Sequence, residues 1–216
     1  MSFILFVSQL LDFILHLDTR LGGIILAYGT WTYALLFAII FCETGLVVLP
    51  FLPGDSLLFA AGAFAAQGAL NATMLFVLLA VAAILGDTLN YWIGYHAGPR
   101  VFREQSKWFK KEYLDRTRAF FAKHGKKTII LARFIPVIRT FAPFVAGIGR
   151  MAYPAFFLYN VIGGILWVGL FTLGGYFFGV LPFVKAHFSL LLIAIIVLSF
   201  VPLVYELIMH KLGHRK

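Results

Sequence analysis

Long apolar stretches separated by short polar segments dominate the hydropathy pattern of this chain. Four of the stretches are apolar throughout, at residues 24–45, 73–98, 155–180 and 187–209. A helix needs about 20 predominantly apolar residues to cross the hydrocarbon core of a bilayer. The pattern therefore predicts four membrane-spanning helices.

Two further apolar stretches, at residues 46–70 and 128–150, are long enough to span a membrane but contain proline and glycine. Proline removes a backbone donor and clashes with the preceding turn. Irregular backbone at membrane depth is tolerated only where it is buried in protein or lines a water-filled cavity. We therefore predict two re-entrant hairpins, each of which enters and leaves the membrane by the same face. The residues expected to break them are Pro50, Pro53, Gly54, Pro136, Pro143 and Gly147.

The N-terminal residues follow a different pattern. Gln9, Asp12 and His16 recur at three- and four-residue spacing in an otherwise apolar stretch, which is typical of a helix lying in the membrane interface. No basic segment precedes the first apolar run, so we predict a retained helix and not a cleaved signal peptide. The predicted organisation is an interfacial helix at 1–23, a transmembrane domain at 24–210 and a basic tail at 211–216.

Composition supports the same class of protein. Hydrophobic residues make up 62% of the 216 residues and charged residues 12%, against about 45–50% and about 25% in soluble domains. Such a chain cannot cover the surface of a water-soluble fold, which argues against soluble enzymes and nucleic-acid binders. The single cysteine, Cys42, excludes an intrachain disulfide and a cysteine-based metal site. We predict an all-α integral membrane protein with neither metal nor cofactor.

The net charge of +9 is concentrated in the segment at 99–127, which holds ten of the 18 Lys and Arg residues. Basic segments stay on the cytoplasmic side of a membrane, so this segment and both termini are predicted to be cytoplasmic. The predicted outer segments, at 46–72 and 181–187, then carry one basic residue, Lys185. We expect the basic segment to contact anionic lipids of the inner leaflet, and we disfavour nucleic-acid binding.

A short internal repeat relates the two halves of the chain. Gly94-Tyr95 is followed by Gly98, and Gly175-Tyr176 by Gly179, and each group ends a span that follows a proline-containing hairpin. Inverted repeats with broken helices that meet near the midplane recur in secondary transporters. The predicted fold is therefore about four transmembrane helices plus two opposed re-entrant hairpins in an inverted repeat.

Five ionisable residues lie inside the apolar segments, where they are energetically costly and are expected to be paired or functional. If the hairpins meet, three carboxylates would surround two guanidinium groups in one cavity. The five residues are Glu43, Asp55, Asp87, Arg133 and Arg139.

The residue types indicate a chemistry. Arginine holds phosphate through two parallel hydrogen bonds and stays protonated when desolvated. A carboxylate whose arginine is intermittently taken by a phosphate can bind and release protons. We therefore expect Arg133 and Arg139 to bind a lipid phosphate, and Glu43, Asp55 and Asp87 to couple its movement to protons. The alternative is a static network that locks the hairpins together, and Asp87 could instead pair with Asn90 or Tyr91.

The same residues lie in two runs that resemble signatures of the bacterial DedA family, over roughly residues 30–210. The first runs from Phe41-Cys42-Glu43-Thr44-Gly45 to Leu52-Pro53-Gly54-Asp55-Ser56, followed by Gly86-Asp87, Tyr91, Gly94 and Gly98. The second contains Leu131-Ala132-Arg133, Pro136, Arg139, Pro143 and Ala146-Gly147.

The resemblance implies a VTT domain, a core shared with lipid scramblases of the endoplasmic reticulum. It also implies a proton-motive-force-dependent transporter that supports the bacterial envelope, since some members recycle undecaprenyl phosphate. The family's acidic pair maps onto Glu43 and Asp55, and its arginine pair onto Arg133 and Arg139.

The predicted function is thus a flippase for undecaprenyl phosphate or a related lipid phosphate in the bacterial inner membrane, with protons as the coupling ion. A passive scramblase for phosphatidylethanolamine or phospholipids in general, and a proton-coupled antiporter for small cations, stay open as alternatives. An intramembrane phosphatase is disfavoured because the histidines lie far along the chain from Arg133 and Arg139. Whether the chain forms a homo-oligomer also stays open.

Overall fold

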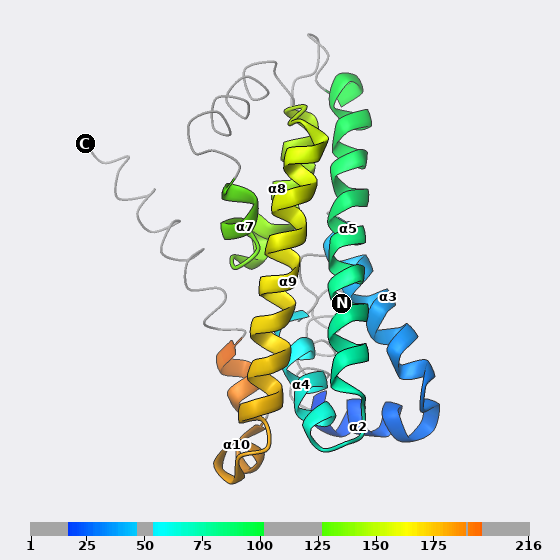
Figure 1. Cartoon of the computed structure of the whole chain (residues 1–216), viewed down its shortest axis with the longest axis vertical. Helices are drawn as coiled ribbons and strands as arrows, with labels where there is room; N and C mark the ends of the chain where they lie inside the picture. Colours follow the sequence, from blue (N-terminus) through cyan, green and yellow to red (C-terminus); the bar gives the residue numbers. More distant parts are fainter. Residues whose placement is uncertain (1–16, 47–53, 102–126, 189, 196–216) are drawn as a thin grey trace, which may run out of the picture. The chain divides into compact units, whose positions relative to one another are not determined.

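The computed structural model describes residues 17–46, 54–101, 127–188 and 190–195, and every regular element in these residues is a helix (Figure 1). The all-α prediction is therefore confirmed for the described part of the chain. In chain order the helices are α2 (Leu17–Tyr28), α3 (Trp31–Gly45), α4 (Gly54–Ala66), α5 (Ala72–Val101), α7 (Thr128–Ala132), α8 (Pro136–Ile148), α9 (Tyr153–Phe178) and α10 (Pro182–Ala186).

Two of the four predicted spans are long, uninterrupted helices. Residues Ala72–Ala97 of α5 and Tyr153–Phe178 of α9 each provide 26 residues with a composition suited to crossing a membrane. The predicted span at 187–209 lies mostly outside the described residues. The same holds for the interfacial helix at 1–23, Pro50, Pro53, the basic segment at 99–127 and the tail at 211–216.

The prediction of one continuous span at 24–45 is wrong. Gly29, at φ +52°, lies in the left-handed region directly after α2, and its N–H bonds to the carbonyl of Ile25 at 2.9 Å. A glycine in this conformation is a common way for a helix to end. A second helix, α3, begins two residues later at Trp31, so helices of 12 and 15 residues replace the predicted span.

The segment predicted as the second hairpin consists of α7 and α8, joined by a turn at residues 133–135. Pro136 begins α8, where its missing N–H would have had no partner within the helix. Pro143 and Gly147 lie inside α8, so the prediction that these two residues break the backbone is wrong. A proline inside a helix at membrane depth is tolerated where a neighbouring helix satisfies the carbonyls that it frees.

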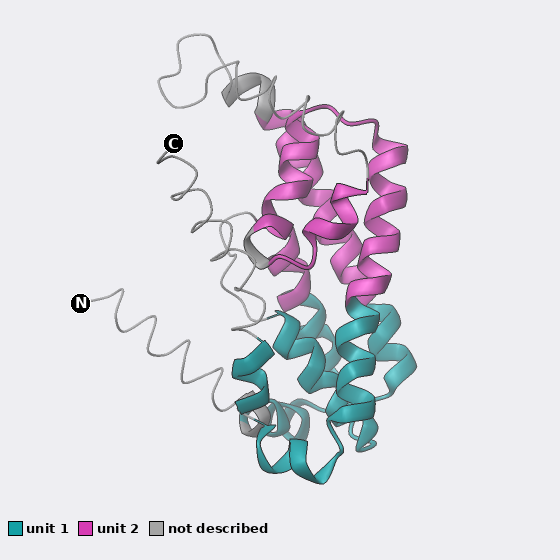
Figure 2. Cartoon of the chain, turned by 90° about the vertical axis from the view of Figure 1, so that its left-hand side faces the viewer, with its two compact units in different colours: residues 1–38, 53–79, 168–216 teal, residues 39–52, 80–167 magenta. Residues whose placement is uncertain are grey.

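The chain divides into two compact units (Figure 2). Unit 1 comprises residues 1–38, 53–79 and 168–216, and unit 2 comprises residues 39–52 and 80–167. Three helices, α3, α5 and α9, contribute residues to both units. Unit 1 also contains α2, α4 and α10, whereas α7 and α8 belong to unit 2.

In unit 1, α4 packs closely against α9. Ten of the 13 residues of α4 are buried, as expected of a helix that is apolar on all sides. A Cβ atom on Gly62 would collide with the backbone of Thr172, and one on Gly175 would collide with the backbone of Phe59. The absence of side chains at these glycines therefore allows the two helix backbones to approach each other.

In unit 2, the same kind of contact joins α8 to α5. A Cβ atom on Gly147 would collide with the backbone of Tyr91, and one on Gly94 would collide with the backbone of Phe144. In both units a Phe-x-x-Gly sequence on the shorter helix meets a Gly-Tyr sequence on the longer one. The repeat read from the sequence therefore recurs as a pair of matching helix contacts, while its opposite membrane orientations stay a prediction.

Candidate functional site

The first ion pair of the site joins α3 to α8 in unit 2. Glu43 lies in the last turn of α3, and Arg139 lies in the first turn of α8, where its N–H bonds to the carbonyl of Ile135 at 2.9 Å. The guanidinium of Arg139 donates to the carboxylate of Glu43. Glu43 is fully buried and Arg139 is 5% exposed. The ring of Trp167 lies 4.7 Å from the guanidinium carbon, in a cation–π contact.

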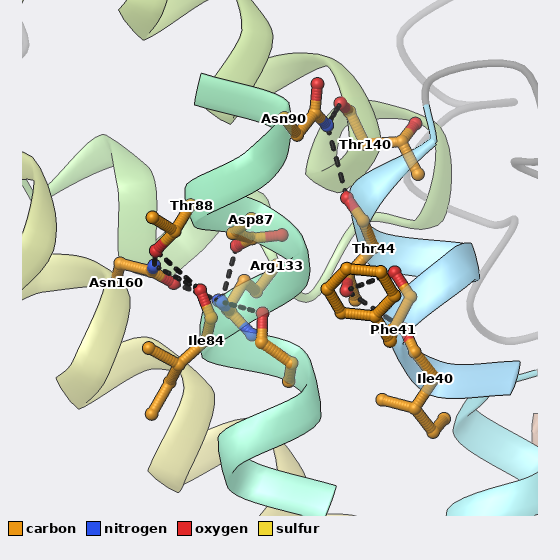
Figure 3. A network of polar contacts seen from close by, with 11 residues as sticks. Ile40, Phe41, Thr44, Ile84, Asp87, Thr88, Asn90, Arg133, Thr140 and Asn160 are labelled. Carbon is orange, nitrogen blue, oxygen red and sulfur yellow. Dashed lines mark hydrogen bonds and ion pairs between the residues drawn. The ribbon is translucent and has the colours of Figure 1, made fainter. Parts of the chain in front are cut away.

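The second ion pair joins α5 to the turn after α7. Arg133 donates through Nη2 to the carboxylate of Asp87, to the side-chain oxygen of Asn160 and, at 3.5 Å, to the carbonyl of Ala83 (Figure 3). Asn160, on α9, in turn donates to the carbonyl of Ile84 at 3.0 Å. This guanidinium therefore holds α5 and α9 together at one point.

Glycines make room for both ion pairs. A Cβ atom on Gly86 of α5 would collide with the carbonyl oxygen of Phe41 on α3, so this glycine brings α5 close to the end of α3. Gly163 and Gly164 on α9 face the side chain of Arg133, and a Cβ on Gly163 would lie 3.1 Å from its Cδ atom. A larger residue at Gly163 would therefore push against the arginine that Asn160 and Asp87 hold.

A third polar tie lies beside the ion pairs. The side-chain amide of Asn90, on α5, donates to the carbonyl of Thr44 at 3.2 Å and to that of Thr140 at 2.7 Å (Figure 3). Thr44 lies in the last turn of α3, where carbonyls have no partner within the helix. Thr140 lies three residues before Pro143, in the turn that a proline disturbs. Asn90 thus ties α5 to the last turn of α3 and to the turn of α8 that precedes Pro143.

The two ion pairs form a neutral set of two carboxylates and two guanidinium groups, buried in one unit. Removing one partner of such a pair leaves an uncompensated buried charge and costs about 3–5 kcal/mol. An anion that displaced a carboxylate from its arginine would keep the guanidinium compensated. The displaced carboxylate would then need a proton to stay buried at low cost. The arrangement is therefore suited to binding an anion together with a proton.

The structure brings together four of the five ionisable residues predicted for the site. Glu43, Asp87, Arg133 and Arg139 lie in unit 2 as two ion pairs. The alternative in which Asp87 pairs with Asn90 or Tyr91 is wrong, because its carboxylate is bound by Arg133. Asp55 is half-buried in the first turn of α4, in unit 1. Its predicted approach to the arginines stays a prediction.

Sequence reasoning missed three residues that hold the site: Asn90, Asn160 and Trp167. Both asparagines are fully buried in long apolar helices, where an amide is costly unless it is hydrogen-bonded. That cost is the same signal that singled out the charged residues, and it would have found both asparagines. Trp167 is one more apolar residue in α9, and no pattern in the sequence indicates that it covers an arginine.

In the described residues every regular element is a helix, and two helices are long and apolar enough to cross a membrane, as expected of a helical membrane protein. A family model described as the VTT domain matches residues 52–177. Protein DedA of Escherichia coli strain K12 is 57% identical over 94% of each chain. Two inner membrane proteins of the same strain are similar: YghB is 36% identical over 72% of this chain and 71% of its own. YqjA is 35% identical over 81% of this chain and 80% of its own.

The chain therefore belongs to the DedA family of VTT-domain membrane proteins, as the sequence signatures indicated. No solved structure matches it with significance.

Proposed function

We propose that this chain moves a lipid phosphate between the leaflets of the bacterial inner membrane, driven by the proton-motive force. The proposed substrate is undecaprenyl phosphate or a related lipid phosphate, and the proposed topology places both termini in the cytoplasm. The membrane location is supported by the names of the relatives YghB and YqjA, which are inner membrane proteins.

The observation that carries the proposal is the buried ion pair between Glu43 and Arg139. A guanidinium recognises phosphate with the same planar fork that it presents to a carboxylate. A phosphate monoester can therefore take the place of Glu43 at Arg139 without leaving the arginine unpaired. Trp167 supports this exchange, because its ring contacts the guanidinium in a cation–π interaction that does not require a carboxylate.

The exchange links the lipid to a proton. When phosphate binds Arg139, the carboxylate of Glu43 loses its cation in a buried site and takes up one proton. When the lipid leaves, Glu43 releases that proton and binds Arg139 again. Charge is conserved in each step, because one negative group always faces the guanidinium. If proton uptake and release face opposite sides of the membrane, the gradient drives the lipid in one direction.

The second ion pair is proposed to bind phosphate and a proton in the same way, with more hydrogen bonds holding its arginine in place. Arg133 stands as the second phosphate ligand and Asp87 as its proton carrier. Because Asn160 and Ala83 also accept from Arg133, we expect exchange there to move α5 against α9. Asp55, in unit 1, is the third proposed proton carrier, and its role depends on reaching the arginines.

A passive scramblase is the alternative that one observation favours. Both ion pairs are complete without a lipid, as a static lock would be. A scramblase would need neither a gradient nor proton exchange at Glu43. A small-cation antiporter would use the carboxylates but would leave Arg133 and Arg139 without a ligand.

The test uses purified protein in liposomes with an imposed pH gradient. Loss of undecaprenyl phosphate from the outer leaflet is followed, with phosphatidylethanolamine as the comparison lipid. The proposal predicts selective movement of the lipid phosphate that stops when the gradient is collapsed. Equal movement of both lipids without a gradient would establish the scramblase instead.

Two variants sharpen this test. Arg139→Lys keeps the charge but loses the planar fork, and we expect it to slow lipid-phosphate flux about tenfold, as for one lost charge-assisted hydrogen bond. Glu43→Gln removes the proton carrier at Arg139 and should weaken the dependence on the gradient. Arg150→Gln is the matched control, since it removes an exposed arginine of the same unit. Full gradient-driven flux in both site variants would overturn the proposal.

A further inference from the structure

Unit 1 contains a cavity of about 280 Å³, and none of the residues that line it belongs to the ion pairs. This volume is close to the lower end of the range of about 300–1,000 Å³ for small-molecule sites. Its lining comes from α2, α4, the residue after α9, α10 and the residues that follow. The lining residues are Gly22, Ala63, Phe64, Gln67, Gly179, Lys185 and Phe188.

The lining combines a cation with apolar surface. Lys185 brings an ammonium group in the last turn of α10. Gln67 adds a side-chain amide, one of whose N–H groups donates to the carbonyl of Ala63 at 3.2 Å, so a second N–H is left for a ligand. Phe64 and Phe188 supply ring surface. An ammonium and an amide donor beside aromatic rings suit a phosphate group attached to a hydrocarbon chain.

The two polar residues of the lining, Lys185 and Gln67, come from segments that the sequence analysis predicted to lie on the outer side. Lys185 is the one basic residue in the predicted outer segments at 46–72 and 181–187, and Gln67 lies in the first of them. The fold brings these two segments to one cavity. A lysine ammonium beside an amide donor attracts an anionic headgroup.

We propose that this cavity is a docking site for a lipid phosphate, where Lys185 and Gln67 hold the phosphate and Phe64 and Phe188 contact the first carbons of the chain. The inference rests on the proposed function, and it adds a collection site in unit 1 to the exchange site in unit 2. The lipid is recognised here by its headgroup before any proton is exchanged.

Two neighbouring glycines of α2 allow a direct test of the cavity. A Cβ atom on Gly22 would lie 3.4 Å from the ring of Phe64, an ordinary contact, so a side chain there would extend into the cavity lining. A Cβ atom on Gly23 would meet nothing within 4 Å. Gly22→Leu should therefore fill the cavity, and Gly23→Leu should add the same side chain to the same helix without filling it.

The experiment labels the full chain in liposomes with a polyprenyl phosphate that carries a photoreactive diazirine near its headgroup. The labelled residues are located by mass spectrometry. The same chain ending in an alcohol tests the need for phosphate, and inorganic phosphate is added as a soluble competitor. The variants are Lys185→Ala, Lys185→Arg, Gly22→Leu and Gly23→Leu, with Lys127→Ala as a matched control on an exposed lysine of unit 2.

We expect label on the peptides that contain Phe64 and Phe188. Labelling should fall about tenfold in Lys185→Ala, as for one lost charge-assisted hydrogen bond, and should recover in Lys185→Arg. It should fall similarly in Gly22→Leu but stay at the wild-type level in Gly23→Leu and Lys127→Ala. Thermal unfolding of each variant shows whether a loss of label comes from misfolding, and Lys185→Arg keeps the result interpretable if Gly22→Leu does not fold.

Three results would overturn the proposal. They are unchanged labelling in both Lys185→Ala and Gly22→Leu, equal labelling by the polyprenyl alcohol, and displacement of the lipid by inorganic phosphate at equal concentration. The last result would make the site one for soluble phosphate. Failure of this site and failure of the proposed function are distinguishable. Gradient-driven flux with unaltered labelling removes only the docking site, whereas specific labelling without flux removes only the transport function.

Discussion

The two units share a way of packing helices and differ in what they bury beside it. In unit 1, Gly62 and Gly175 bring α4 against α9, and in unit 2, Gly147 and Gly94 bring α8 against α5. Seven residues before the crossing glycine, unit 2 has Asp87 where unit 1 has the buried Val168.

The next polar position differs in the same way. Four residues before the crossing glycine, unit 2 has Asn90, and unit 1 has Phe171. Close contacts between helices in membranes depend on small residues, so the glycines are sufficient to explain the shared packing. The charged and amide residues are therefore an addition to one unit, and we attribute the exchange chemistry to that addition.

The largest effect is expected from separating the partners of a buried ion pair. Arg133→Ala leaves Asp87 buried without its cation and should lower the free energy of unfolding by about 3–5 kcal/mol. Replacing both residues, as in Asp87→Leu with Arg133→Met, should recover most of that loss, because neither charge remains. Denaturant unfolding in micelles measures both variants. A double variant as unstable as Arg133→Ala would show that the pair is not an independent part of unit 2.

The shared packing can be tested by adding one methyl group to each unit. Gly94→Ala and Gly175→Ala both place a Cβ against a helix backbone, and overpacking of this kind costs about 1–3 kcal/mol. We expect similar losses in thermal unfolding experiments. Gly23→Ala, which meets open space, should have no such cost. A large loss for one crossing glycine and none for the other would break the equivalence of the two units.

A smaller effect is expected from the amide tie that unit 2 has and unit 1 lacks at the matched position. Asn90→Leu removes the donors to the carbonyls of Thr44 and Thr140. Hydrogen bonds between helices in membranes contribute about 0.6–2 kcal/mol, so the loss of stability should fall in this range. Hydrogen exchange should speed up in the last turn of α3 and around Thr140. Unchanged exchange at both places would mean that Asn90 does not support them.

The smallest effects concern the ends of the shorter helices. Both α4 and α8 are followed by a residue at positive φ, Gly68 at +80° and Arg150 at +53°. Gly68→Ala should cost about 1 kcal/mol, because residues with a Cβ are strained in this region. Arg150→Gly relieves that strain but loses the contact with the Tyr95 ring at 5.2 Å, so the net change should be within about 0.5 kcal/mol. Differential scanning fluorimetry resolves the first change, and a gain of stability in Gly68→Ala would contradict it.

The sequence predicts the helical class, the two long spans and four residues of the site, because each depends on a strong local signal. Long apolar runs and charges inside them are visible without any knowledge of contacts. The break at Gly29 was missed, because a single glycine in an apolar run is compatible with a continuous helix or with its end. Pro143 was misread for the opposite reason. Whether a proline breaks a helix depends on the packing around it, which the local sequence does not reveal.

The sequence also does not reveal which carboxylate pairs with which arginine. Glu43 and Arg139 are far apart along the chain, and any of the three carboxylates satisfied the expected charge balance. Only the packing of α3 against α5, through Gly86, and of α8 against α5 decides which carboxylate meets which arginine. Asp55 belongs to unit 1, and its approach to the arginines stays a prediction.

The central claim is that a lipid phosphate displaces Glu43 from Arg139 and that Glu43 then takes up a proton. Proton uptake can be measured directly by adding undecaprenyl phosphate to detergent-solubilised protein in a weakly buffered solution with a pH indicator. The account predicts that wild type takes up about one more proton per bound lipid than Glu43→Gln does, because only one of them has a carboxylate to protonate. Equal uptake by the two proteins at equal lipid binding would contradict it.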